Sequence, residues 1–279
     1  MNAPHIFQPF VVSDSELALF QTLFKQQIGL HLSDEKKALL ASRLESRLMA
    51  LGLSRFHDYY RFITGPGEAA AEELQQAIDL ITTNETYFFR EPAHFEFLSQ
   101  SIVPATRADA PFSVWSAASA SGEEAYSIAM VLHDTLGDAP WRVLGSDVSQ
   151  RVLRSARRGM YPLSRCEHIP QPYLKRYCLR GVDEYTGQLL VERSLRERVS
   201  FVSMNLTRLP DTLGQFDVIF LRNVIIYFDL PTKIRVLESV LRYLRPGGYL
   251  ITGHSESLHG VCVPLEAVAS AIYRKPVNP

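Results

Sequence analysis

Polar side chains flank an aromatic run at residues 82–95, "TTNETYFFREPAHF". Asn84 and Thr86 precede Phe88 and Phe89, and Arg90 follows the two rings directly. An amide, a hydroxyl and a guanidinium can hold the polar groups of a ligand by hydrogen bonds. We interpret the two phenylalanines as a hydrophobic connector that plugs the interface between two halves of the chain. The polar residues are candidates for a binding site.

A second candidate lies in "VWSAASASGEEAYS", where an apolar run ends near Ala117 and a helical pattern begins at Glu123. The small residues between them, with Gly122 last, would let a ligand approach the backbone, as in nucleotide-binding turns. Glu123 and Glu124 occupy the first helical turn, where carboxylates repel phosphate and suit a cationic amine. An equally good reading is that they only complement the helix dipole.

An acid and an amide end two further apolar runs. Asp147 ends "WRVLGSD", near the spacing of about 20 residues after the turn that is typical of nucleoside-binding units. An acid there commonly accepts hydrogen bonds from ribose hydroxyls, although Asp147 could equally belong to the cap of the next helix. Asn205 ends "VSFVSMN" and offers an amide that could read an adenine edge.

The run "FDVIFLRNVIIYFD" delivers Arg222 and Asn223 to the end of an apolar segment, with Tyr227 shortly after. The alternative is a loop arginine in water and a core tyrosine. Because polar residues gathered after so apolar a run favour a binding loop, we count all three as site candidates.

The elements that must position these residues fall into two halves. From Ser13 to about Leu80 the periodicity is helical, with a capping signal in Ser13 and Glu16. The remainder alternates short apolar runs with helical patterns, which is the signature of a parallel sheet covered on both faces. In such sheets ligands bind beyond the carboxyl ends of the strands. The predicted strands are "FSVWSAA", "WRVLGSD", "VSFVSMN", "FDVIFLRN" and "GGYLITG".

One interval, residues 163–198, breaks this alternation and is too long for a simple connection. Its segment "QLLVERS" alternates as a strand does. We therefore predict three parts: an all-helical domain over 1–83, a second domain over 84–279, and a small antiparallel β-subdomain inserted at 163–198.

The composition excludes several classes of protein. Charged residues make up 21% and apolar residues 46% of 279, and the net charge is -1, so neither disorder nor bulk attraction to nucleic acid is indicated. No apolar stretch reaches membrane-spanning length, and the start lacks a signal-peptide pattern. Three cysteines without a CxxC pair indicate thiols in a reducing cytoplasm. The histidines include no HxH or HExxH pair, so no metal is expected.

Five motifs in the same order resemble the chemotaxis receptor methyltransferases, the CheR family, over roughly residues 7–275. These motifs are "TTNETYFFREPAHF", "VWSAASASGEEAYSIAM", "GSDVSQRVLRSARRGMY", "FDVIFLRNVIIYFD" and "LRPGGYLITGHSESL". The resemblance implies a Rossmann-like class I methyltransferase sheet. It also implies transfer of a methyl group from S-adenosylmethionine to glutamate side chains of chemoreceptor cytoplasmic domains.

The resemblance also implies site residues. The cofactor residues would be Asn84, Thr86, Arg90, Glu124 rather than Glu123, Asp147, Asn205, Leu206, Arg222 and Asn223. Arg90 would also orient a carboxylate, either the substrate's or the cofactor's, and Tyr227 would wall the transferred methyl group. Both therefore count as catalytic candidates.

Partners are suggested by charge and by the same resemblance. The interval from Lys36 to Arg61 contains six basic residues and only two acidic ones. At about 100° per residue on a helix, Lys36, Arg43 and Arg47 fall within an arc of about 40°. Without the resemblance this would be a solvated helix face; with it, the arc is expected to touch acidic receptor helices. In some members of the family the β-subdomain holds a receptor tail peptide. A cytoplasmic monomer is expected.

Two other functions compete with this interpretation. A methyltransferase for a small molecule would need neither the helical domain nor the insertion. A catalytically dead scaffold would not need to retain Asn84, Arg90, Asp147, Arg222 and Asn223 together.

Overall fold

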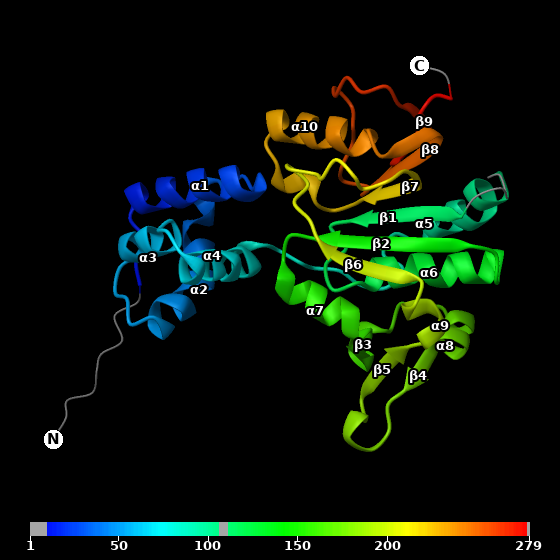
Figure 1. Ribbon diagram of the computed structural model, residues 1–279, viewed down its shortest axis with the longest axis horizontal. Coiled ribbons are helices and arrows are strands. Elements are labelled where there is room, and N and C mark those ends of the chain that lie inside the picture. The colour runs from blue at the N-terminus through cyan, green and yellow to red at the C-terminus, as the bar shows by residue number, and fades with distance from the viewer. Residues whose placement is uncertain (1–9, 106–110, 278–279) are drawn as a thin grey trace. The chain divides into compact units, whose positions relative to one another are not determined.

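The computed structural model describes residues 10–105 and 111–277, and the chain divides into two compact units, Met1–Thr83 and Asn84–Pro279 (Figure 1). Residues 1–9, where the predicted first domain begins, lie outside the described residues. The first unit is helical, as expected. It contains α1 (Asp14–Ile28), the 3₁₀ helix η1 (Asp34–Lys36), α2 (Lys37–Ala50), α3 (Phe56–Ile63) and α4 (Glu68–Ile81).

The helix signals of this unit act as the sequence indicates. Ser13 and Glu16 form a reciprocal capping box at the start of α1, and Gly29 ends the helix in the left-handed region with φ 76°. Leu40, Leu44 and Leu48 share one face of α2 and are fully buried. Lys36 is a correction: it lies in η1 and not in α2. It is the N-cap residue of α2 and directly precedes the helix that carries Arg43 and Arg47.

The second unit is built on a seven-stranded sheet in the order β6-β2-β1-β7-β8-β10-β9. The predicted strands correspond to β1 (Phe112–Ala117), β2 (Trp141–Asp147), β6 (Val199–Ser203), β7 (Phe216–Leu221) and β8 (Leu244–Thr252), and they pair in parallel. β10 (Ile272–Arg274) and β9 (Glu266–Ala269) extend the edge in antiparallel fashion. Sequence analysis missed both edge strands because they are short and β9 is exposed throughout.

Helices cover both faces of this sheet, with α6 and α7 on one side and α10 on the other (Figure 1). Their bounds are α6 (Glu123–Leu136), α7 (Gln150–Arg158) and α10 (Leu230–Leu241); α5 (Pro92–Phe97), the π-helix η2 (Leu98–Ile102) and η3 (Val103–Ala105) precede β1. Successive strand residues face opposite layers, so Val114 and Trp115 belong to different core clusters. This two-sided burial explains why the strands are continuously apolar.

A separate three-stranded antiparallel sheet, in the order β3-β5-β4, forms the predicted β-subdomain. Its first strand lies just before the predicted range 163–198. The elements are β3 (Met160–Pro162), η4 (Leu163–Arg165), α8 (Gln171–Tyr177), β4 (Cys178–Arg180), η5 (Asp183–Tyr185), β5 (Gln188–Val191) and α9 (Arg193–Arg196).

Phe88 and Phe89 have a different role from the one expected. Phe88 packs edge-on against Tyr161, and Phe89 stacks on Tyr173 and touches Phe95, all within the second unit. Both rings belong to the core cluster of that unit. The expectation that they join the two halves is therefore wrong: they anchor their own segment to the sheet domain.

Candidate cofactor and active site

The strand order creates a topological switch point beside β1. From β1 the chain proceeds through β2 to β6 on one side of the sheet, and then returns to β7 and β8 on the other. In open parallel sheets the crevice at such a point, beyond the carboxyl ends of the strands, is where ligands bind. The predicted residues Asp147, Asn205, Arg222 and Asn223 end or follow β2, β6 and β7, so the fold directs them to this edge.

The turn between β1 and α6 has an unusual backbone. Ala118 and Ala120 adopt positive φ values of 70° and 46°, and Gly122 follows at 97°. Holding non-glycine residues in this left-handed region costs conformational free energy, and such strain often accompanies functional sites. A Cβ on Gly122 would lie 2.9 Å from both the Ala156 Cβ and the Tyr161 hydroxyl, so only glycine fits. The turn is thus packed closely against Ala156 and Tyr161.

Asp147 joins this turn to the end of β2. Its Oδ2 accepts a hydrogen bond from the Ala120 N–H at 3.0 Å, and its Oδ1 accepts one from the Ser149 N–H at 2.9 Å. The hydroxyls of Ser119 and Ser149 are buried and lack hydrogen-bond partners among the described residues. Buried polar atoms normally have partners, so these two hydroxyls indicate a place for a polar ligand.

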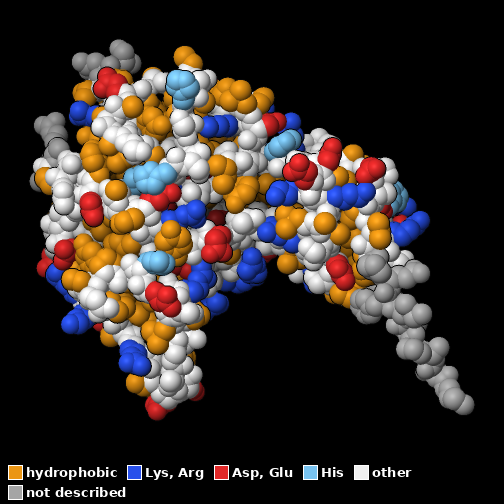
Figure 2. All heavy atoms as spheres, turned by 180° about the vertical axis from the view of Figure 1, so that it is seen from behind, with side chains coloured by type: hydrophobic (Ala, Val, Ile, Leu, Met, Phe, Trp, Pro, Cys, Tyr) orange, Lys and Arg blue, Asp and Glu red, His pale blue; other side chains and the backbone are white. Residues whose placement is uncertain are grey.

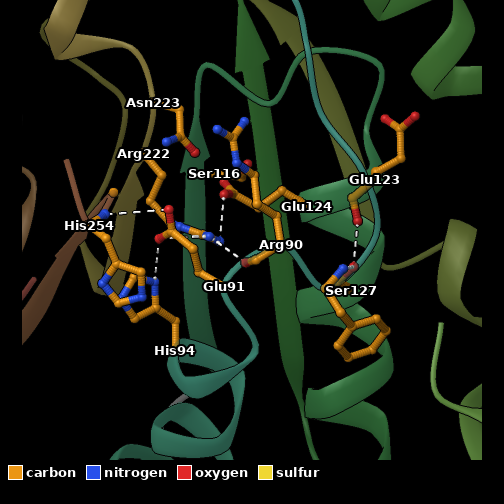
Figure 3. A network of polar contacts seen from close by, with 12 residues as sticks. Arg90, Glu91, His94, Ser116, Glu123, Glu124, Ser127, Arg222, Asn223 and His254 are labelled. Carbon is orange, nitrogen blue, oxygen red and sulfur yellow. Dashed lines mark hydrogen bonds and ion pairs between the residues drawn. The ribbon is translucent and has the colours of Figure 1, made fainter. Parts of the chain in front are cut away.

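Arg222 lies at the centre of a network of polar contacts (Figure 3). Its guanidinium contacts Glu124 Oε2 at 3.2 Å and Glu91 Oε2 at 3.1 Å, and it donates to the Arg90 carbonyl oxygen. The Arg222 side chain is only 1% exposed. Its charge is therefore engaged by protein groups, and Arg222 holds Glu124 and the Arg90 backbone in place.

The pKa values of the two carboxylates in this network are shifted in opposite directions. Burial raises the pKa of Glu124, although the Arg222 charge and a 2.7 Å hydrogen bond from Ser116 oppose it. Burial also acts to raise the pKa of Glu91, but the Arg222 charge and the His254 N–H outweigh it, so that the pKa of Glu91 lies below its usual value. The network therefore favours an anion at Glu91.

His94 and His254 lie next to Glu91. Their rings are 4.8 Å apart, and the His94 Nδ1 is 3.3 Å from Glu91 Oε2. Burial, helped by the Arg222 charge, lowers the pKa of His94 to about 4. The three residues carry donor atoms within 4.8 Å of one another, close enough to hold a metal ion. Because the Arg222 guanidinium contacts the same Glu91 oxygen and would repel a cation, we assign them to the ion-pair network.

Glu123 and Glu124 point to different partners. Glu123 is fully buried, with Oε1 2.6 Å from the Arg165 guanidinium and Oε2 accepting from the Ser121 hydroxyl at 2.8 Å. Burial raises the pKa of Glu123. Arg165 comes from the β-subdomain and also donates to the Thr86 carbonyl oxygen at 3.2 Å. Glu123 is therefore occupied by protein contacts, whereas Glu124 lies with the Arg222 network.

The segment that carries Asn84, Thr86 and Arg90 contacts helices α6 and α7 of the second unit. The Asn84 amide oxygen accepts from Arg151 of α7 at 3.4 Å. Arg90 donates to the Glu85 carbonyl oxygen at 3.2 Å and stacks over Tyr87, with 5.7 Å from Cζ to the ring centroid. The Phe89 N–H donates to the Ser127 hydroxyl of α6 at 3.0 Å, which fixes the segment to the sheet domain.

The remaining predicted residues occupy two loops. Asn205 accepts from the Thr207 N–H at 3.0 Å and the Thr207 hydroxyl at 2.8 Å, so its oxygen closes a turn after β6, and Leu206 is buried behind it. Asn223 begins the loop after β7 with a positive φ of 58°, and Tyr227 ends the short 3₁₀ helix η6 (Ile225–Tyr227).

Sequence reasoning missed three charged residues of the site: Glu91, Arg165 and Glu256. Glu91 follows Arg90 directly and could have been suspected for that reason. Glu256 follows the strand "GGYLITG" by a few residues, which places it at the carboxyl edge of the sheet. Nothing in the sequence around Arg165 indicates that it reaches the buried Glu123.

These residues fit S-adenosylmethionine, whose methionine part carries an amine and whose nucleoside carries ribose hydroxyls. The Glu124 carboxylate suits the amine, and Asp147, with the unpartnered Ser119 and Ser149 hydroxyls beside it, suits a ribose. Carboxylates at the start of α6 disfavour a phosphate-bearing cofactor. The strained small-residue turn permits close approach of a ligand to the backbone.

Two family descriptions match the chain: "CheR methyltransferase, all-alpha domain" over residues 15–82, and "CheR methyltransferase, SAM binding domain" over residues 84–273. Chemotaxis protein methyltransferase 2 of Pseudomonas aeruginosa is 39% identical over 249 residues, covering 88% of this chain and 87% of the relative. The chemotaxis protein methyltransferase of Salmonella typhimurium is 38% identical over 269 residues, covering 95% and 92%. The chain therefore belongs to the CheR family of S-adenosylmethionine-dependent methyltransferases.

Proposed function

We propose that this chain methylates glutamate side chains on the cytoplasmic domains of chemoreceptors, giving glutamate 5-O-methyl esters and S-adenosylhomocysteine in chemosensory adaptation. The proposal is carried by one observation: in a chain of this family, the fold gathers Glu124, Asp147, Arg222 and Asn223 around the switch point of the sheet. The relatives in Pseudomonas aeruginosa and Escherichia coli bear the name chemotaxis protein methyltransferase.

The proposed cofactor contacts follow from the positions of the polar groups. Glu124, held by Ser116 and Arg222, takes the amine of the methionine part. Asp147 takes the ribose hydroxyls, because an acid at the end of the second strand of such a sheet commonly accepts hydrogen bonds from a ribose. The other proposed contacts, carried over from the family, are Asn84, Thr86, Arg90, Asn205, Leu206, Arg222 and Asn223.

The chemistry asked of the protein is modest. When bound, S-adenosylmethionine supplies an electrophilic methyl group on a sulfonium. A glutamate has an unperturbed pKa of about 4.3, so the incoming side chain is already a carboxylate at neutral pH and needs no general base. The work of the chain is to bind, to orient and to exclude water. We assign orientation of a carboxylate to Arg90, and the wall beside the transferred methyl group to Tyr227.

The direct test uses labelled S-adenosylmethionine and receptor cytoplasmic fragments, scored as base-labile methanol. The wild-type chain should label a receptor fragment, and absence of base-labile label on any fragment refutes the proposed substrate. Arg90→Ala should lower turnover by about 10²-fold, because positioning supplies most of the rate. Arg158→Ala, which changes an exposed arginine of α7, is the matched control and should leave turnover unchanged. Full turnover with normal cofactor affinity in Arg90→Ala would remove Arg90 from this role.

We also propose that basic residues of the first unit contact the receptor. Lys36 is exposed and remains the leading candidate for contact with acidic receptor helices. Arg43 and Arg47 contribute charge to the same surface, but they also have structural partners. Arg43 donates to the Ile81 carbonyl and to Thr83 at the end of α4, and Arg47 forms a bidentate pair with Glu73 at 2.8 and 2.7 Å.

On the face drawn in Figure 2, basic and acidic side chains are interspersed. This face therefore carries no broad surface of one charge that would attract an acidic receptor helix. The edges of the β-subdomain sheet could take an added strand from a receptor tail peptide. No helix among the described residues is long and apolar enough to cross a membrane. We propose a cytoplasmic monomer.

A further inference from the structure

A buried acid outside the predicted site, Glu256, contacts the loop that carries two of the proposed site residues. Glu256 lies in the turn after β8 and is only 1% exposed. Its Oε2 accepts hydrogen bonds from the N–H groups of Asn223 and, at 2.9 Å, Gly253. Its Oε1 accepts from the Ile226 N–H at 3.3 Å. One carboxylate therefore binds both ends of the turn after β7.

The backbone around Glu256 is itself fixed. The Glu256 N–H donates to the Gly253 carbonyl oxygen at 2.8 Å, and the Thr252 hydroxyl donates to the Glu256 carbonyl oxygen at 3.2 Å. A side chain at Gly253 would crowd this contact, because a Cβ there would lie 2.7 Å from the Asn223 side-chain Nδ2 and 2.8 Å from Glu256 Oε2. The end of β8 thus presents the carboxylate to the end of β7.

The loop needs this support because of its conformation. Asn223 is held in the left-handed region at φ 58°, which is uncommon for a non-glycine residue and persists only when its surroundings enforce it. Ile226, whose N–H is one of the bound groups, is 52% exposed, so its apolar packing is weak. Hydrogen bonds to an ionised acceptor are the stronger kind, and they are well suited to hold such a loop.

We propose that Glu256 is a positioning residue for methyl transfer: it braces residues 223–227 so that Asn223 and Tyr227 keep their places at the cofactor edge. The inference rests on the proposed function, because it assigns those two residues to the site. Glu256 does not itself touch the reacting atoms in this assignment. Its effect is transmitted through the backbone of the loop after β7.

Glu256→Gln tests the hydrogen bonds of the Glu256 carboxylate without changing the size of the side chain. Glutamine has the same size but only one carbonyl oxygen, and its other end is an NH₂ donor. It can therefore accept from the Asn223 and Gly253 pair or from Ile226, but not from both, and its NH₂ must face an N–H. The charge-assisted character of all three hydrogen bonds is lost as well.

The measurements combine binding, kinetics and amide exchange. We expect Glu256→Gln to weaken S-adenosylhomocysteine binding in calorimetry, to speed hydrogen exchange at the amides of residues 223, 226 and 253, and to lower kcat by about 10²-fold per binding-competent site. Asp217→Asn is the matched control, since Asp217 is also a buried carboxylate, accepting from the Ser113 N–H at 2.7 Å at the opposite end of β7. It should leave kcat and binding per folded molecule unchanged.

Gly253→Ala provides a second variant in case Glu256→Gln does not fold. It keeps the carboxylate, but its methyl group crowds Glu256 Oε2 and the Asn223 side chain. It should therefore give the same pattern of change. Equal kcat, KM and S-adenosylhomocysteine affinity per folded molecule in either variant and the wild-type chain would overturn the positioning role. That result is distinct from failure of the proposed function, which would show as no receptor methylation by the wild-type chain in the same assay.

Discussion

Removal of the Arg222 guanidinium is the sharpest test of the site's electrostatics. Arg222 is paired with Glu91 and Glu124, whose side chains are 15% and 13% exposed. Replacing it by methionine of similar length leaves two carboxylates together without their cation. Breaking a buried pair by removing one partner costs about 3–5 kcal/mol. We therefore expect Arg222→Met to lower the free energy of unfolding of the second unit by that amount at pH 7.

A double variant checks the origin of the loss. Arg222→Met with Glu91→Gln restores the original net charge of the three side chains, so it should recover a large part of the lost stability. It should not recover cofactor binding, because Glu124 and the Arg90 carbonyl are still released. The pH dependence has a defined sign: the pKa of Glu91 is lowered in the folded state, so its stabilising contribution is present above its ordinary value of 4.5 and is lost as the pH falls.

The assay is urea unfolding followed by tryptophan fluorescence. Trp115 and Trp141 are the two tryptophans of the chain, and both are buried in the second unit, so the signal reports on the part that contains Arg222. Arg176→Met is the control: its pair with Asp134 has both side chains about half exposed and should cost under about 1 kcal/mol. A loss below about 1 kcal/mol in Arg222→Met, or a double variant no more stable than the single one, would refute the reasoning.

Three further predictions concern pH and charge. His94 titrates near 6.5 when unfolded but at about 4 when folded, so the unfolded state binds the proton first and stability falls as the pH drops between these values. Between pH 7 and pH 5 this amounts to about 2 kcal/mol, and His94→Gln should lose that much less stability in the same fluorescence assay; identical pH profiles would contradict the assignment. Lys36→Glu should raise the KM for receptor fragments and leave the thermal unfolding midpoint unchanged. Arg47→Glu should instead lower the midpoint, because it places a second carboxylate beside the buried Glu73; an unchanged midpoint would show that the Arg47 pair contributes nothing.

Much of the fold could be predicted because its signals are local. The capping box at Ser13 and the left-handed glycine at Gly29 define α1, and both depend only on neighbouring residues. The parallel strands are buried on both faces, so they read as continuous apolar runs bounded by turns. The edge strands β9 and β10 were missed because pairing with β8, and not their own composition, makes them strands.

The candidate site shows a similar division. Asp147, Arg222 and Asn223 could be chosen from the sequence because each ends or follows a strand, and parallel strands bring their carboxyl ends to one edge. The resemblance to the family added the cofactor and the proposed roles of Asn84, Thr86 and Arg90.

Only the tertiary structure decided which charges pair. Sequence spacing gives no sign that Arg165 of the β-subdomain meets Glu123, that Arg222 is enclosed by Glu91 and Glu124, or that Glu256 binds the backbone after β7. Such contacts join residues far apart in the chain, and their geometry follows from how the layers pack. The sequence by itself thus determined which elements form and which edge carries the site. Packing determined which side chains can face a ligand and which are occupied in holding the others.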